Sequence, residues 1–280
     1  MLRSGSASDN RSRGSGTPWW VARPLVREAL LIAGAILAYF GIRNLTAGSP
    51  DPAFDNAERL IAFQERIGID WEDELQSLVI DHGLLIDVAN WVYIWGHWPV
   101  ILSTAVVLFA LRRGRYVLLR NALFVSGAIG FLFFALFPVA PPRYLELGLV
   151  DTVTERSYAY RALQPPGLTN QYAAFPSLHA GWNLLVGIAL FLSFSRPVVR
   201  AFALAMPLAM ALAVVVTANH FVIDVAAGVA VVLVGLGAAV VMARRGSATS
   251  TLDEDAASSD VAGGDGSIGS AAARDRAPRR

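Results

Sequence analysis

His220–Ala243 reads HFVIDVAAGVAVVLVGLGAAVVMA and is apolar except at its start, where His220 and Asp224 lie four residues apart. An α-helix of this length is long enough to cross about 30 Å of hydrocarbon. Residues 178–195 form another strongly apolar stretch, which opens with Pro176-Ser177-Leu178-His179. A titratable side chain in lipid costs several kcal/mol, so such residues usually mark function. Both stretches therefore predict membrane-spanning helices with a functional histidine at their start.

Composition supports a membrane protein. The 280 residues are 55% hydrophobic and only 16% charged, and mean hydropathy is +0.48, whereas a soluble domain would be far more polar. The absence of cysteine excludes disulfides, thiolate metal sites and cysteine nucleophiles. All 23 basic residues are arginine, which biased genome composition explains, so no lysine is available to bind phosphate. The net charge of +1 gives no indication of nucleic-acid binding, and we expect none.

Six apolar stretches are long enough to span a bilayer, at residues 25–45, 84–111, 117–138, 178–195, 198–218 and 220–243. They predict an all-α, polytopic bundle of about six transmembrane helices. The first stretch could be a signal peptide, but no clear cleavage site follows it, so we expect it to be retained. Four parts follow: a disordered tail (1–17), the first span with outer helices (18–83), a membrane domain (84–245) and a second disordered tail (246–280).

Arginine placement predicts the orientation. The shorter connections on one side carry arginines consistently, which places that side and both termini in the cytoplasm and both helix-opening histidines outside. The inner arginines beyond the N-terminal tail include Arg112, Arg113, Arg115, Arg120, Arg196, Arg200, Arg244 and Arg245. We expect the membrane to be the plasma membrane.

Two outer connections are long. In residues 46–83 the apolar positions have helical spacing, which predicts short amphipathic helices, either on the membrane surface or packed on the bundle. Residues 139–177 are rich in proline and carry arginines and aromatics, which favours a functional loop.

The residues at the starts of the two histidine-bearing spans suit phosphoryl transfer. Ser177 is placed to cap one helix, and helix N-termini attract anions. Asp224 falls on the same helix face as His220. If the two helices are neighbours, the imidazoles of His179 and His220 converge, and histidine can act as nucleophile or as acid. Each residue alone could be an interfacial, capping or structural group; the combination favours a site.

Two further residues are candidates for substrate contact. His97 lies within the second predicted span and should face the bundle or a polar cavity, as a substrate or supporting contact or as a packing residue. Arg143 follows the third span in Ala140-Pro141-Pro142-Arg143-Tyr144. Its guanidinium suits phosphate, although it could also be a surface arginine near lipid headgroups.

The motifs Pro176-Ser177-Leu178-His179 and His220-Phe221-Val222-Ile223-Asp224 resemble those of the type 2 phosphatidic acid phosphatase superfamily. The resemblance implies that His220 is the nucleophile, Asp224 its orienting partner and His179 the acid for the leaving group, with residues 84–245 as the phosphatase or phosphotransferase domain. The family's first motif has no clear match, Val214 replaces an arginine and Leu178 a glycine. The Ala140-Pro141-Pro142 segment is more similar to the branch containing fungal inositol phosphorylceramide synthase. Arg143 is then the candidate replacement for a missing cation.

We therefore expect a membrane lipid phosphatase or phosphotransferase with catalytic residues His179, His220 and Asp224. Arg143, Ser177 and His97 are expected to bind the substrate, a lipid phosphate or phosphodiester. Water or an acceptor alcohol would take the phosphoryl group among the membrane lipids, with no cofactor and no metal. Two alternatives stay open. One is a non-catalytic transporter or binding protein for lipids or anions, and the other is a catalytically inactive relative that scaffolds partners.

Overall fold

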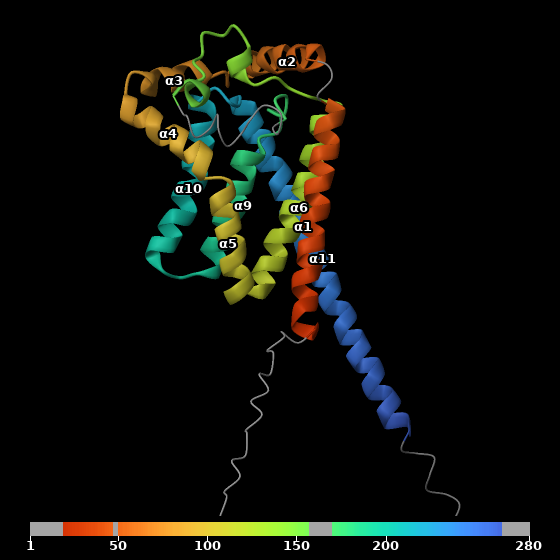
Figure 1. The fold of residues 1–280 in the computed structure, drawn as a ribbon. Helices are drawn as coiled ribbons and strands as arrows, with labels where there is room; N and C mark the ends of the chain where they lie inside the picture. The colour runs from red at the N-terminus through yellow and green to blue at the C-terminus, as the bar shows by residue number, and fades with distance from the viewer. Residues whose placement is uncertain (1–18, 47–49, 157–169, 265–280) are drawn as a thin grey trace, which may run out of the picture. The chain divides into compact units, whose positions relative to one another are not determined.

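The structure is a computed structural model that describes residues 19–46, 50–156 and 170–264 (Figure 1). Within these ranges it is all-α, as predicted, with a single isolated bridge between Val139 and Ala173. The chain divides into two compact units, residues 1–42 and 43–280. All described residues of the first unit, 19–42, belong to the helix α1, Trp19–Thr46. The predicted N-terminal tail and the end of the C-terminal tail lie outside the described residues.

The second unit contains a bundle of apolar helices. Among the described residues, three helices are long and apolar enough to cross a membrane: α6 (Arg113–Leu136), α10 (Pro197–Val216) and the Val222–Arg245 part of α11. The helix α9 (Leu178–Ser193) is also apolar but is shorter than these three. The helix α11 runs from Val222 to Gly264 and so continues into the stretch that the sequence assigned to a tail.

The second predicted span, residues 84–111, is not one continuous helix. It consists of α4 (Gly83–Trp95) and α5 (Trp98–Leu111), which are bent by 50° at a short break. Pro99 explains the break, because it lies in the first turn of α5 and lacks the N–H that would bond back into α4. His97 therefore lies at a bend between two half-spans and not inside a regular helix.

The starts of α9 and α11 pack tightly against each other through small residues. A Cβ atom on Gly228 of α11 would overlap the carbonyl oxygen of Ser177, and one on Gly181 of α9 would lie 2.7 Å from the carbonyl oxygen of Gly228. Such close backbone approach needs small residues at a helix interface in a membrane. The contact brings together the two helix starts that carry the histidine motifs.

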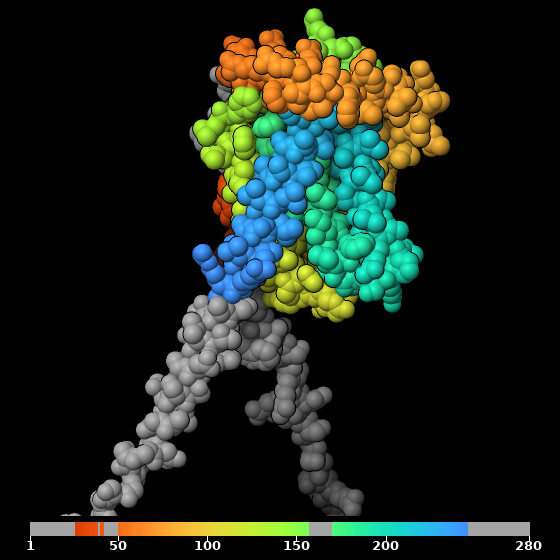
Figure 2. Space-filling model, turned by 180° about the vertical axis from the view of Figure 1, so that it is seen from behind, coloured from red at the N-terminus to blue at the C-terminus, as the bar shows by residue number. Residues whose placement is uncertain are grey.

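The outer helices pack across one end of the bundle (Figures 1 and 2). They are α2 (Asp51–Ile67) and α3 (Glu72–Ile80). Buried side-chain amides attach both helices to the rest of the second unit. Gln76 Nε2 donates to the carbonyl oxygen of Val216 at 2.9 Å, and Asn56 Nδ2 donates to that of Pro138 at 3.0 Å. Of the two locations considered for these helices, the structure has the one on the bundle. Two shorter helices follow α6, the 3₁₀ turn η1 (Pro142–Tyr144) and α7 (Thr152–Arg156).

The glycine contact generates a stability prediction. Gly228→Ala should destabilise the protein by about 1–3 kcal/mol, because the new methyl group must push α9 away from α11. The matched control is Gly237→Ala on the same helix, where a Cβ meets nothing within 4 Å. The control should be neutral or slightly stabilising, since alanine is the better helix former. Thermal unfolding in detergent measures both, and equal melting temperatures would contradict the packing described.

Candidate active site

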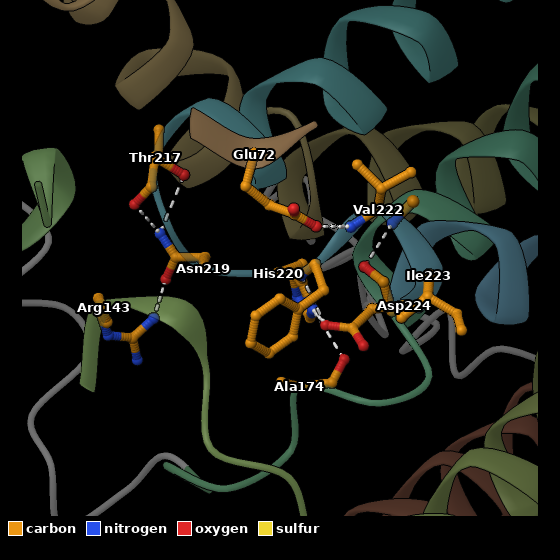
Figure 3. A network of polar contacts seen from close by, with 12 residues as sticks. Glu72, Arg143, Ala174, Thr217, Asn219, His220, Val222, Ile223 and Asp224 are labelled. Carbon is orange, nitrogen blue, oxygen red and sulfur yellow. Dashed lines mark hydrogen bonds and ion pairs between the residues drawn. The ribbon is translucent and has the colours of Figure 1, made fainter. Parts of the chain in front are cut away.

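The two histidine motifs meet at one end of the bundle. The backbone N–H of Ser177, just before α9, donates to the carbonyl oxygen of Asp224 at 2.9 Å. The ring centroids of His179 and His220 are 5.8 Å apart. The condition set by the sequence, that the two helices are neighbours, is therefore met. Figure 3 shows the polar contacts that surround His220.

His220 lies in the tight turn between α10 and α11. Ala218 has a positive φ of 56° there, and the N–H groups of Asn219 and His220 both donate to the carbonyl oxygen of Val214. His220 Nδ1 lies 2.7 Å from the carbonyl oxygen of Ala174 and 3.4 Å from Asp224 Oδ2. A carbonyl oxygen only accepts, so Nδ1 carries the proton and Nε2 keeps its lone pair. The neutral ring in this tautomer has the form of a nucleophile.

Electrostatics also favour a neutral His220. Burial lowers the pKa of this imidazole from 6.5 to about 4, while the hydrogen bond to Ala174 acts in the opposite direction and the charge of Arg143 adds to the lowering. At neutral pH the side chain is thus unprotonated at Nε2. The sequence assigned the orienting role to Asp224 alone; the structure adds the Ala174 carbonyl, which makes the shorter contact.

His179 stands in the first turn of α9 among other rings. It stacks on Tyr93 with a centroid distance of 4.9 Å and an interplanar angle of 16°. His97 covers it at 4.1 Å and itself stacks on Trp182 at 5.9 Å. These contacts restrict the plane of the His179 ring.

His97 and Ser177 occupy supporting positions. His97 is buried at the α4–α5 bend and faces the bundle, and its Nδ1 lies 3.4 Å from Asn183 Nδ2. Ser177 is fully buried, and its hydroxyl accepts from Ala180 N, which makes it the N-cap of α9 as predicted. Direct substrate contact by either residue stays a prediction.

Arg143 is held beside the His220 turn by three contacts. Its backbone N–H donates to the carbonyl oxygen of Ala218 at 3.0 Å. Its Nη1 donates to Asn219 Oδ1, and its Nε lies 3.6 Å from Asp151 Oδ2. Asn219 is itself oriented, because its Nδ2 donates to the backbone and hydroxyl oxygens of Thr217. The guanidinium is therefore anchored at the site and is not a mobile surface group.

Asn219 is a further residue of the candidate site, because it links Arg143 to the His220 turn. Its position directly before His220 is the only signal in the sequence, because the partner Arg143 is 76 residues away.

The N–H groups at the N-terminus of α11 are already occupied, contrary to one expectation from the sequence. The sequence suggested that its free N–H groups would attract phosphate, but three successive N–H groups already have acceptors. Phe221 N donates to Asp224 Oδ2 at 2.8 Å, Val222 N to Glu72 Oε1 at 2.7 Å and Ile223 N to Gln64 Oε1 at 2.8 Å. Two carboxylates therefore occupy this helix end, and an anionic substrate has to be held elsewhere.

No group of three or more histidine, aspartate or glutamate side chains within the described ranges has an arrangement that could hold a metal ion.

Comparison with known families agrees with the motifs. The family model described as the PAP2 superfamily matches residues 58–238, and this protein belongs to that superfamily. The membership supports a phosphatase-type activity on lipid phosphates, that is, a phosphoric ester hydrolase in the membrane. No curated protein and no solved structure gives a significant match to the chain.

The anchored guanidinium generates a kinetic prediction. Arg143→Gln should lower kcat/KM for a short-chain phosphatidic acid by about two orders of magnitude, because it removes a preorganised donor for the phosphoryl oxygens. Arg143→Lys should recover part of this loss, since lysine keeps the charge but not the two-pronged geometry. The control with the same change of charge is Arg120→Gln. Arg120 lies near the start of α6, whereas Arg143 follows the end of that helix. Equal rates for Arg143→Gln and Arg120→Gln would exclude Arg143 from phosphate binding.

Proposed function

We propose that this protein is an integral membrane lipid phosphatase or phosphotransferase that works through a phosphohistidine on His220. One observation carries the proposal. The Nδ1 proton of His220 is directed at the Ala174 carbonyl, which leaves Nε2 as the nucleophilic atom, and the His179 ring lies 5.8 Å away. A nucleophile and an acid at this separation can act on opposite sides of one phosphorus atom.

In the first step, His220 Nε2 attacks phosphorus and the bond to the leaving oxygen breaks. His179, which takes up a proton when the anionic phosphate binds beside it, gives this proton to that oxygen, and the Ala174 carbonyl and Asp224 hold the Nδ1–H of the phosphorylated ring. In the second step, the now neutral His179 takes a proton from water or an alcohol. The oxygen of that water or alcohol attacks phosphorus, the bond between phosphorus and His220 Nε2 breaks, and His220 is restored.

Arg143, anchored by Asn219, supplies the positive charge for the phosphoryl oxygens in this proposal. In this proposal, Arg143 replaces the positively charged side chains of the superfamily's motifs that have no counterpart in this sequence. His97 supports the His179 ring through their contact, and Ser177 holds the start of α9.

We place the site at the extracytoplasmic face of the plasma membrane, with both termini inside. The support is the distribution of charge. Arg112 lies between α5 and α6, Arg113 is the first residue of α6, and Arg196 and Arg200 lie at the start of α10. These connections are at the end of the bundle away from α2 and α3 (Figure 1), and the positive-inside rule assigns that end to the cytoplasm.

Transfer to an alcohol, with inositol phosphate as one possible head group, is the finer form of the proposal. The Ala140-Pro141-Pro142 segment before Arg143 supports it through the resemblance to inositol phosphorylceramide synthase. Water and an alcohol require the same two histidines, so hydrolysis is the other outcome. A non-catalytic lipid or anion transporter is the alternative from another class.

A trapping experiment tests the phosphohistidine. With para-nitrophenyl phosphate the leaving group needs no proton, so a His179→Gln variant should form the intermediate and release it slowly. Radiolabelled phosphate should then accumulate on the protein as an acid-labile, base-stable adduct, whereas His220→Ala should show none. His82→Ala, an exposed histidine outside the site, should behave like the wild type. A transporter would give no label with any of these proteins.

A substrate panel separates the two reaction types. Purified protein is incubated with lipid phosphates and phosphodiesters, each with and without inositol, and the products are resolved by mass spectrometry. A transferase should form a new inositol phosphate ester only when inositol is present, a monoester from a lipid phosphate and a phosphodiester from a lipid phosphodiester, because the alcohol then competes with water for the phosphohistidine. Free phosphate in equal yield under both conditions would reject transfer to inositol and leave hydrolysis.

A further inference from the structure

The outer helices reach the site through two buried polar side chains. Glu72, the first residue of α3, is 7% exposed, and Gln64, in the last turns of α2, is 1% exposed. Glu72 Oε1 accepts from Val222 N at 2.7 Å and from Gln64 Nε2 at 3.0 Å. Gln64 Oε1 accepts from Ile223 N at 2.8 Å. Figure 3 shows Glu72 pointing at the start of α11 from the side opposite Ala174.

The N–H groups that these side chains hold lie between His220 and Asp224 in the sequence. Asp224 Oδ2 completes the set by accepting from Phe221 N at 2.8 Å and lies 3.4 Å from His220 Nδ1. Any fraying or rotation of this first turn would therefore move the Asp224 carboxylate relative to the imidazole. The backbone at this point depends on acceptors from 150 and 159 residues away.

We propose that Glu72 and Gln64 are positioning residues for the reaction, because they fix the first turn of α11 and with it the distance between Asp224 and His220. The inference rests on the proposed function and extends it to α2 and α3. These helices then belong to the catalytic unit, which begins well before residue 84, where the sequence placed the start of the catalytic domain. The family match, which starts at residue 58 inside α2, supports this extension.

If Glu72 acts by accepting hydrogen bonds, its glutamine and alanine variants should differ in activity. Glu72→Gln keeps an oxygen that can accept from both Val222 N and Gln64 Nε2, whereas Glu72→Ala removes it. Glu72→Ala should lower kcat by about tenfold to a hundredfold, as expected for a supporting contact behind a catalytic group. KM should change less than about twofold, because in this proposal Glu72 and Gln64 hold the backbone of α11 and do not contact the substrate. Glu72→Gln should recover most of the rate.

The matched control is Asn90→Ala. Asn90 is also buried and makes two hydrogen bonds, from its Nδ2 to the Thr152 carbonyl oxygen at 3.1 Å and from Thr152 Oγ1 to its Oδ1 at 2.9 Å. It ties α4 to α7 and makes no contact with α11 among the interactions described. The melting temperature of this control should fall as that of Glu72→Ala does, but its kcat should stay at the wild-type value. If Glu72→Ala fails to fold, Gln64→Ala carries the same test through Ile223 N.

Hydrogen–deuterium exchange of the backbone at residues 221–227 gives a readout that needs no activity. Exchange there should be faster in Glu72→Ala and Gln64→Ala than in the wild type, and unchanged in Asn90→Ala. Unchanged exchange in Glu72→Ala, or a kcat no lower than that of Asn90→Ala, would overturn the inference. So would a Glu72→Gln variant as slow as Glu72→Ala. A wild-type protein with no activity on any lipid phosphate would instead contradict the proposed function, while the exchange arm would still decide the positioning.

Discussion

The hydrogen bond from Ser177 N to the carbonyl oxygen of Asp224 sets the register between α9 and α11, on which the candidate site depends. His179 follows Ser177 by two residues, and His220 precedes Asp224 by four, so this one contact brings the two imidazoles together. Gly228 makes the approach possible, because its lack of a side chain lets the Ser177 backbone lie against α11. A shift of one helical turn, about 5 Å, would separate the histidines.

The side chains that contact the two sides of the histidine turn differ in charge. Carboxylates from Glu72 and Asp224 take the N–H groups of α11, and the guanidinium of Arg143 stands on the Asn219 side of the histidine turn. A helix N-terminus favours negative charge, so Glu72 and Asp224 are stabilised there. They occupy the position at which a substrate anion would otherwise bind. In the proposed mechanism, this separation leaves the Arg143 side for the phosphate and the α11 side for holding the nucleophile.

Much of this architecture could be predicted from local patterns. Apolar length predicted about six membrane helices, and in the described part of the chain three helices, or four with the bent α4–α5 pair, have the length and hydropathy of a span. The i,i+4 spacing placed Asp224 on the face of His220. The bend at His97 was missed, although Gly96 and Pro99 both marked it, because the apolar run across residues 84–111 has the length of a single span. Asn219 and the Ala174 carbonyl were also missed. Their importance comes from a positive φ at Ala218 and from chain segments that meet only after folding.

Hydropathy, helical spacing and the two motifs are local properties of the chain, so they were enough to indicate the class of protein and the residues that could carry the chemistry. The sequence by itself did not determine which atoms of those residues face one another. The tautomer of His220, the anchoring of Arg143 and the capping of α11 by Glu72 and Gln64 depend on contacts between residues 46 to 159 positions apart. These contacts exist only in the folded chain, because a buried polar group in a bundle takes whichever partner the packing of the helices brings to it.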